Sequence, residues 1–234
     1  MVEANPSTNA GDGVVRNIQY ATFRKDKPAA PGYTAELLSD RVDPKYYDNL
    51  DAQPIEEGGK DTLLQYFRRN VANRPHEPFL GTRNQLEQLD ANGKVQYGDY
   101  TWRSYAEVDR ICQNLAKGLN SMDLCPEVEG EGKNWRFVGI WAKNRYEWTA
   151  TLLAGMHFNI TTVGFYDAQS TEQVDYIVRQ TEMTTIVCTE DYAARLVAMR
   201  KNDMVPTLKT LVVTNECKPA LLQQAQEVGI NVVT

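Results

Sequence analysis

The residues that could bind a ligand lie after two predicted strands in the middle of the chain. Asn144 and Arg145 follow the apolar run Phe137–Trp141, while Tyr166 and Asp167 end a second β-branched and aromatic run. Open α/β sheets bind ligands at the carboxyl ends of their parallel strands, so these side chains stand where a site would be. An arginine there can hold a carboxylate or a phosphate, although a structural salt bridge is the favoured interpretation.

Two further pairs of residues admit both a chemical and a structural interpretation. Trp141 and Trp148 could stack on a ligand, but core packing is the favoured role. Glu190 and Asp191 begin a predicted helix, where the helix dipole favours negative charge, and an acid-base pair is the alternative. The residues therefore indicate no catalytic group.

Common nucleotide-binding and nucleophile motifs are absent. No G-x-G-x-x-G follows a strand, and neither G-x-x-x-x-G-K-[ST] nor G-x-S-x-G occurs. The 4 cysteines lack the paired spacing of a metal site, and the chain has only 2 histidines, His76 and His157. We predict no metal site and expect Cys112 and Cys188 to pack in the core.

A β-α-β unit must position the candidate residues. Phe137–Trp141 is rich in strand formers and too short for a helix. Apolar residues then recur at helical spacing over Glu147–His157, and Ile160–Tyr166 returns to a strand pattern. Because a tight turn cannot connect parallel strands, the two strands are expected to run parallel with a right-handed crossover.

The alternation of strand and helix continues to the end of the chain. The later elements are a helix from Ser170, strand Thr184–Cys188, helix Tyr192–Arg200, strand Thr210–Val213, helix Pro219–Val228 and strand Ile230–Val233. The earlier ones are a helix from Asp61 or Thr62, a hairpin joining Phe79–Arg83 to Val95–Trp102, a helix behind the capping box at Ser104, and an acidic loop over Cys125–Lys133. This pattern predicts an α/β fold, a doubly wound and mostly parallel sheet with an antiparallel hairpin.

Composition and proline content predict how the chain is divided. Residues 1–59 have scattered prolines and little periodicity, so we predict an irregular N-terminal arm followed by an α/β region over residues 60–234. The last strand ends at Thr234 without a covering helix, so the fold is expected to be incomplete. A net charge of -6 argues against a broad nucleic-acid-binding surface. With no membrane-spanning apolar run or signal peptide, we expect a cytoplasmic or peripheral protein.

Seven short sequence blocks occur in a fixed order along the chain. They are Gly81-Thr-Arg83, Tyr100-Thr-Trp102, Ser104-Tyr-Ala-Glu-Val108, Val138-Gly-Ile-Trp-Ala-Lys-Asn-Arg-Tyr-Glu-Trp148, Phe165-Tyr-Asp167, Tyr176-Ile-Val-Arg-Gln-Thr-Glu182 and Ile186-Val-Cys188. Over roughly residues 61–234 this ordered set resembles the amino-terminal part of eukaryotic long-chain acyl-CoA synthetases, which are adenylate-forming enzymes. The chain departs from that family at Gly164-Phe165 and Ala168-Gln-Ser170, where the family has a proline and then Thr-Leu-Gly. The subfamily and the acyl-chain length therefore stay open.

The resemblance implies a two-step ligase reaction for a complete enzyme. A long-chain fatty acid carboxylate attacks the α-phosphate of Mg-ATP, and the thiol of CoA then displaces AMP. It thus implies ATP, Mg²⁺ and CoA as cofactors, with peripheral contact at the endoplasmic reticulum or peroxisomal membrane. The family's phosphate loop, adenine motif, ribose-binding aspartate and mobile lysine have no counterpart in this sequence. We therefore expect a fragment that is inactive alone.

The resemblance also supplies three candidate CoA contacts. Gly164, Phe165 and Arg195 stand where related acyl-CoA and acetyl-CoA ligases approach the CoA nucleotide. Glycine allows close backbone approach and arginine suits a phosphate, but a strand-end glycine and a solvated helix arginine are the favoured structural interpretations. Two functional alternatives remain, namely a non-catalytic binding or regulatory module derived from the family and an unrelated flavodoxin-like domain.

Overall fold

The computed structural model describes residues 21–24, 26–27, 29–33, 35–39, 42–49 and 62–234. The chain divides after Asp61 into two units, and each is described by itself. In the first, β1 (Ala21–Phe23) pairs antiparallel with β2 (Leu37–Ser39), and a 3-10 helix, η1 (Pro44–Tyr46), follows. Much of the predicted arm, residues 1–59, lies outside the described residues, so its irregular character and its boundary stay predictions.

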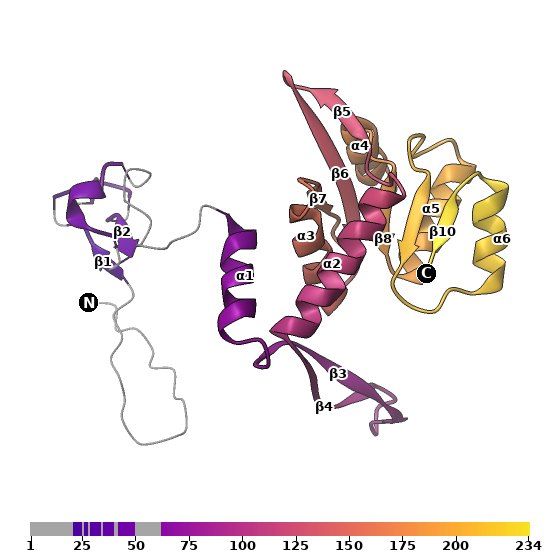
Figure 1. The fold of residues 1–234 in the computed structure, drawn as a ribbon, viewed down its shortest axis with the longest axis horizontal. Coiled ribbons are helices and arrows are strands. Elements are labelled where there is room, and N and C mark those ends of the chain that lie inside the picture. Colours follow the sequence, from indigo (N-terminus) through magenta and orange to yellow (C-terminus); the bar gives the residue numbers. More distant parts are fainter. Residues whose placement is uncertain (1–20, 25, 28, 34, 40–41, 50–61) are drawn as a thin grey trace. The chain divides into compact units, whose positions relative to one another are not determined.

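The second unit holds the α/β fold. Its elements are α1 (Leu63–Asn73), β3 (Pro78–Leu89), β4 (Val95–Ser104), α2 (Tyr105–Ser121), β5 (Glu127–Gly130), β6 (Lys133–Trp141), α3 (Tyr146–Met156), β7 (Thr161–Gly164), α4 (Thr171–Thr181), β8 (Thr185–Cys188), α5 (Glu190–Lys201), β9 (Thr210–Val213), α6 (Pro219–Glu227) and β10 (Asn231–Val233) (Figure 1). From β6 onward every strand is followed by a helix until β10. The predicted α/β class is confirmed.

Five strands of the main sheet run parallel, and the order in which they pair reverses at β6. Gly139 on β6 is the register partner of both Val163 on β7 and Ile186 on β8, so β6 lies between those two strands. The sheet then continues from β8 through β9 to β10, all parallel. The chain therefore leaves β6 for β7 on one side and returns for β8 on the other. This reversal is a topological switch point, where open α/β sheets bind ligands.

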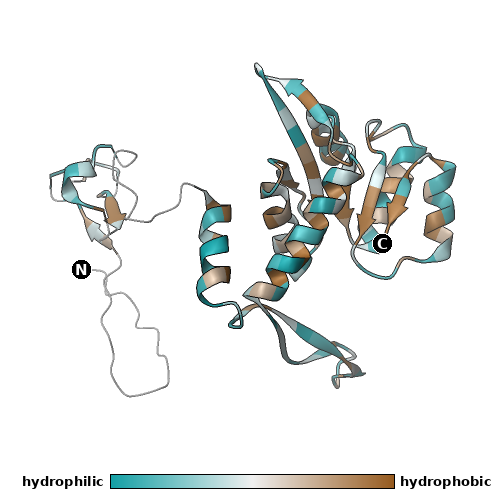
Figure 2. Cartoon of the chain, viewed as in Figure 1, coloured by the Kyte–Doolittle hydropathy of each residue, from teal (hydrophilic) through white to brown (hydrophobic). Residues whose placement is uncertain are grey.

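Helices cover both faces of the sheet. Successive residues on a strand point to opposite faces, and β6 follows this rule. Trp141 packs in the core that contains α4, α5 and α6, whereas Val138 and Ile140 pack with Leu119 of α2 and Ile160. A third cluster joins α1, α2 and α3 through Phe67, among other residues. Figure 2 shows hydrophobic residues concentrated in β9 and β10 and hydrophilic residues along much of α2 and α6. The doubly wound arrangement is confirmed.

The segment Cys125–Lys133 was predicted as a loop, and this prediction is wrong. Glu127–Gly130 forms β5, which pairs antiparallel with the first part of β6. The turn between them has φ of 53° at Glu131 and 75° at Gly132. Positive φ at both central residues is the signature of a type I′ hairpin, whose twist matches that of the flanking strands. β6 is accordingly longer than the predicted Phe137–Trp141.

The predicted hairpin and capping box are both present. β3 and β4 pair antiparallel, and the carboxylate of Asp90 accepts hydrogen bonds from the backbone of Asn92 and Lys94 in the turn, at 2.8 Å each. At the start of α2 the Ser104 hydroxyl accepts from the Glu107 backbone at 3.3 Å, while the Glu107 carboxylate accepts from the Ser104 backbone at 2.7 Å. This reciprocal pair fixes where α2 begins.

Candidate functional site

The candidate site is the carboxyl edge of the parallel sheet, beside the switch point between β6 and β8. The loop after β6 carries Asn144 and Arg145, the loop after β7 carries Tyr166 and Asp167, and α5 begins at Glu190 directly after β8. Because β6 and β7 run parallel, the first four of these residues follow neighbouring strand ends, as predicted. A hydrogen bond from Nε1 of Trp141, the last residue of β6, to the Tyr166 carbonyl at 3.1 Å joins β6 to the loop after β7.

Trp141 is the centre of an aromatic cluster under this edge. Its side chain is fully buried, so the predicted core role is confirmed. Its ring stacks on Tyr192 of α5 with centroids 4.7 Å apart, and the Phe165 ring lies 5.8 Å away. The guanidinium of Arg195 lies over the same indole, 4.6 Å from its centroid. Stacked rings and a cation-π contact make a rigid platform from residues of three elements.

The structure places Phe165 and Arg195 against the same indole, and Gly164 directly precedes Phe165 at the end of β7. Arg195 is partly exposed and donates one hydrogen bond, from Nη2 to the Gln169 carbonyl at 3.2 Å. Phe165 is 4% exposed, and its N–H donates to the Ile140 carbonyl at 2.9 Å, so the residue belongs to the core. Gly164 is exposed, and a Cβ there would lie 2.9 Å from the Trp148 ring. The role of the three residues in CoA binding stays a prediction.

Arg145 forms a salt bridge with Glu147. Its Nε and Nη2 donate to the two oxygens of Glu147 at 2.7 and 2.6 Å. These bonds raise the pKa of Arg145 above its usual value, with burial opposing them. The favoured interpretation of Arg145 as a structural salt bridge is therefore confirmed. Asn144 and Tyr166 stay exposed at the edge, Tyr166 with 82% of its surface accessible.

The first turn of α5 carries two negative charges, and residues of the loop between β9 and α6 contact it. Glu190 and Asp191 occupy the first turn, as predicted, where the helix dipole stabilises them. The Glu190 backbone N–H donates to Asn215 Oδ1 at 2.9 Å, and Lys218 pairs with its carboxylate at 3.5 Å. The Glu190 side chain is therefore used in a structural contact, in line with the favoured interpretation.

Tyr192 is the residue at this edge that the sequence did not indicate. Burial, with a hydrogen bond to Asp167, raises the pKa of Tyr192 to about 12, so the phenol stays protonated at neutral pH. It contacts Trp141 from α5, one helical turn before Arg195. Tyr192 and Arg195 are three residues apart and therefore lie on one face of α5. This spacing is the sequence feature that could have indicated Tyr192 as a neighbour of Arg195.

The remaining candidates for chemistry are metal-ligating clusters and cysteine thiols. Among residues 62–234 and the described part of the first unit, no cluster of three His, Cys, Asp or Glu side chains could hold a metal ion. Cys188 is buried at the end of β8, and burial raises the pKa of its thiol. Its packing role is as predicted, as is that of the buried Cys112.

Comparison with known proteins decides the family. The family model described as AMP-binding enzyme matches residues 67–231, which is most of the chain. The chain belongs to the AMP-binding enzyme family. Among its relatives, long-chain-fatty-acid CoA ligase 5 of Rattus norvegicus is 25% identical over 174 residues, covering 74% of this chain and 23% of the relative. Long chain acyl-CoA synthetase 4 of Arabidopsis thaliana is 27% identical over 177 residues, covering 76% and 24%. The resemblance to long-chain acyl-CoA synthetases is confirmed.

Solved structures agree on the fold of this AMP-binding chain. The adenylation domain of a carboxylate reductase from Mycobacterium chelonae matches with a TM-score of 0.59 and 18% identity, covering 76% of this chain and 28% of that one. The corresponding domain from Segniliparus rugosus, solved with AMP and a co-purified carboxylic acid, gives a TM-score of 0.55 and 17% identity, covering 73% and 27%. The chain spans about a quarter of the length of the curated relatives it matches.

Proposed function

We propose that the chain is the amino-terminal part of a long-chain fatty acid CoA ligase and forms part of its CoA-binding surface. The observation that carries this proposal is the match of residues 67–231 to the AMP-binding enzyme family, together with relatives that are named as long-chain-fatty-acid CoA ligases. The switch-point edge supports it, because a family-wide ligand site is expected at that edge of such a sheet.

The exposed groups at the edge suit an anionic nucleotide. Arg195 uses one face of its guanidinium on Trp141 and one N–H on the Gln169 carbonyl, so further N–H groups remain for a phosphate. Gly164 presents backbone without a side chain two residues before Tyr166, whose ring is largely exposed. When bound, CoA would supply the thiol that accepts the acyl group. In the proposal Arg195 holds its phosphate and Trp141 keeps Arg195 in place.

The chemistry of ATP and Mg²⁺ belongs, in this proposal, to other parts of a complete ligase. The sequence contains no counterpart of the family's phosphate loop or adenine motif, and the described residues contain no metal-ligating cluster. We therefore assign no activation step to this chain. No helix among the described residues has the length and apolar character needed to cross a membrane. A cytoplasmic location, with peripheral contact at the endoplasmic reticulum or peroxisomal membrane, is part of the same proposal.

Thermal unfolding in the presence of each substrate tests the proposed function. We expect CoA to raise the unfolding midpoint of the chain in a saturable way, because a ligand that binds only the folded form stabilises it by mass action. Mg-ATP and palmitate should give smaller shifts or none. Incubation of the chain with all three should form no palmitoyl-CoA. A transition that none of the three ligands moves would contradict a retained CoA surface.

A further inference from the structure

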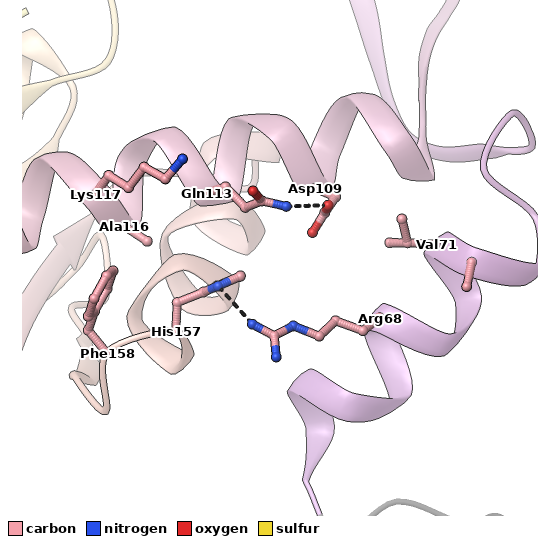
Figure 3. Close-up of a pocket in the computed structure, with 9 residues that line it drawn as sticks. Arg68, Val71, Asp109, Gln113, Ala116, Lys117, His157 and Phe158 are labelled. Atoms are coloured by element: carbon pink, nitrogen blue, oxygen red, sulfur yellow. Dashed lines mark hydrogen bonds between the residues drawn. The ribbon is translucent and has the colours of Figure 1, made fainter.

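A concave site lies away from the carboxyl edge, at the end of α3 that leads to the amino end of β7. It has a volume of about 600 Å³ and lies between α1, α2 and the C-terminal end of α3 (Figure 3). Arg68 comes from α1, Asp109 and Lys117 from α2, and His157 and Phe158 from the end of α3. α3 leaves the carboxyl end of β6 and returns to the amino end of β7, so this space is separate from the CoA edge.

Hydrogen bonding fixes the proton on His157. Arg68 Nη2 lies 3.2 Å from His157 Nδ1, and the two side chains point toward each other in Figure 3. A guanidinium has no acceptor, so Nδ1 must accept and the proton of a neutral imidazole must be on Nε2. That Nε2 is buried and has no partner in the described part of the chain. A buried donor without an acceptor is uncommon in folded proteins.

The charges that face His157 favour an anion with a single charge. The pKa of His157 is lowered by burial and by Arg68, with Asp109 opposing, so the imidazole is neutral at pH 7. Among the described residues neither Lys117 nor Arg68 forms an ion pair, and Arg68 hydrogen-bonds the neutral imidazole. Asp109 accepts a hydrogen bond from Gln113 at 2.6 Å. Two cations against one carboxylate leave one excess positive charge, on a chain whose net charge is -6.

The remaining walls are apolar. Val71 and Ala72 of α1, Ala116 of α2 and Phe158 line the same space. Pockets for small organic ligands combine apolar walls with a few convergent polar groups that fix orientation. We propose that this space binds a small amphiphilic carboxylate, whose head contacts Arg68 beside His157 and whose hydrocarbon body contacts the apolar walls, while Lys117 at the rim adds positive charge. The proposal does not depend on CoA binding at the other edge.

Octanoate is the probe for this site, and the full chain is the protein. A saturable rise in the thermal unfolding midpoint is expected with octanoate. Octanol, which lacks the charge, and inorganic phosphate, which lacks the apolar body, should give no saturable shift. Arg68→Gln and Lys117→Gln should each weaken the apparent affinity for octanoate about fivefold. Arg69→Gln, on the same helix but outside the site, is the matched control and should leave it unchanged.

Two further readouts separate binding from general stabilisation. Ala72 is exposed, so Ala72→Phe can fill the space without disturbing the core, and it should abolish the octanoate shift while the chain still unfolds cooperatively. In a His76→Gln background His157 is the remaining imidazole, and its pKa measured by NMR should rise when octanoate binds, because an adjacent anion favours the charged form.

An unchanged octanoate shift in both Arg68→Gln and Ala72→Phe, or an equal shift with octanol or phosphate, would overturn the proposal. Arg195→Met should leave octanoate binding intact, which keeps this test distinct from that of the CoA edge.

Discussion

Replacing Trp141 with alanine is expected to lower the free energy of unfolding of the second unit by about 3 to 5 kcal/mol. The indole is fully buried on β6, stacks on Tyr192 at 4.7 Å and donates to the Tyr166 carbonyl at 3.1 Å. Alanine would leave a cavity under the carboxyl edge and remove one of the two hydrogen bonds that the Tyr166 carbonyl accepts, the other coming from the Gln169 N–H. Urea unfolding followed by circular dichroism measures the loss.

Two variants isolate the cause of that loss. Trp141→Phe keeps most of the apolar contact and loses the hydrogen bond to the Tyr166 carbonyl, so its cost should be clearly smaller than that of alanine. Trp102→Ala removes an indole of the same size from β4, where it is 53% exposed, and should cost below about 1 kcal/mol. Equal losses for Trp141→Ala and Trp102→Ala would show that Trp141 is not the centre of the core at this edge.

Gly155→Ala is expected to destabilise the chain by about 1 to 3 kcal/mol, although alanine is the better helix former. A Cβ at Gly155 on α3 would lie 2.7 Å from the Ile160 carbonyl oxygen and 3.1 Å from Thr162 Oγ1. The first of these is backbone and cannot move aside like a side chain. The Ile160 N–H also donates to the Gly155 carbonyl at 2.8 Å, and Asn159 has a φ of 55°. The turn after α3 is therefore tight and left-handed, and it brings the chain directly into β7.

The same substitution elsewhere in the unit should have the opposite sign. Gly118 lies in α2, and an added Cβ would meet nothing within 4 Å. Gly118→Ala should therefore stabilise by about 0.5 to 1 kcal/mol, since alanine loses less conformational freedom in a helix. Chemical denaturation of the two variants in parallel provides the measurement. Stabilisation by Gly155→Ala would mean that α3 does not approach β7 as closely as described.

The β-α-β unit could be predicted from the sequence because its residues obey local rules. Phe137–Trp141 is apolar and short, and the helix that follows has apolar residues at helical spacing, so strand and helix differ in period. Once both strands are assigned, parallel pairing follows from the length of the connection. The same reasoning placed Asn144, Arg145, Tyr166 and Asp167 at one edge without any knowledge of their contacts.

β5 could not be predicted because its strand character comes from its partner. Glu127–Gly130 is polar and short, and it is held by pairing with residues 133–136 of β6, which are themselves mostly polar. Strand formation at such positions depends on the neighbouring strand more than on intrinsic propensity. The turn that joins β5 to β6 has positive φ at Glu131 and Gly132. Its sequence does not indicate a type I′ turn clearly, because glutamate is an unusual residue at the first central position.

The sequence indicated the candidate site only in part. Arg195 could be placed by resemblance, but its contact with Trp141 joins α5 to β6 across many residues, and no local pattern reports such a pairing. Phe165 is buried beside the same indole, which follows from packing rather than from strand periodicity. Arg145, which could have held a ligand at this edge, is bound to Glu147 two residues later, as the favoured structural interpretation predicted.

Calorimetric titration of CoA into the chain tests the central claim most directly, with two arginine variants of the same helix. Methionine at Arg195 keeps an apolar stem over Trp141 but removes the charge. Arg200 is the matched control, because it donates to the Val205 and Pro206 carbonyls near the other end of α5. We predict saturable binding of CoA that Arg195→Met weakens about tenfold and Arg200→Met leaves unchanged. No saturable binding, or equal affinities of the two variants for CoA, would contradict a CoA surface at the switch-point edge.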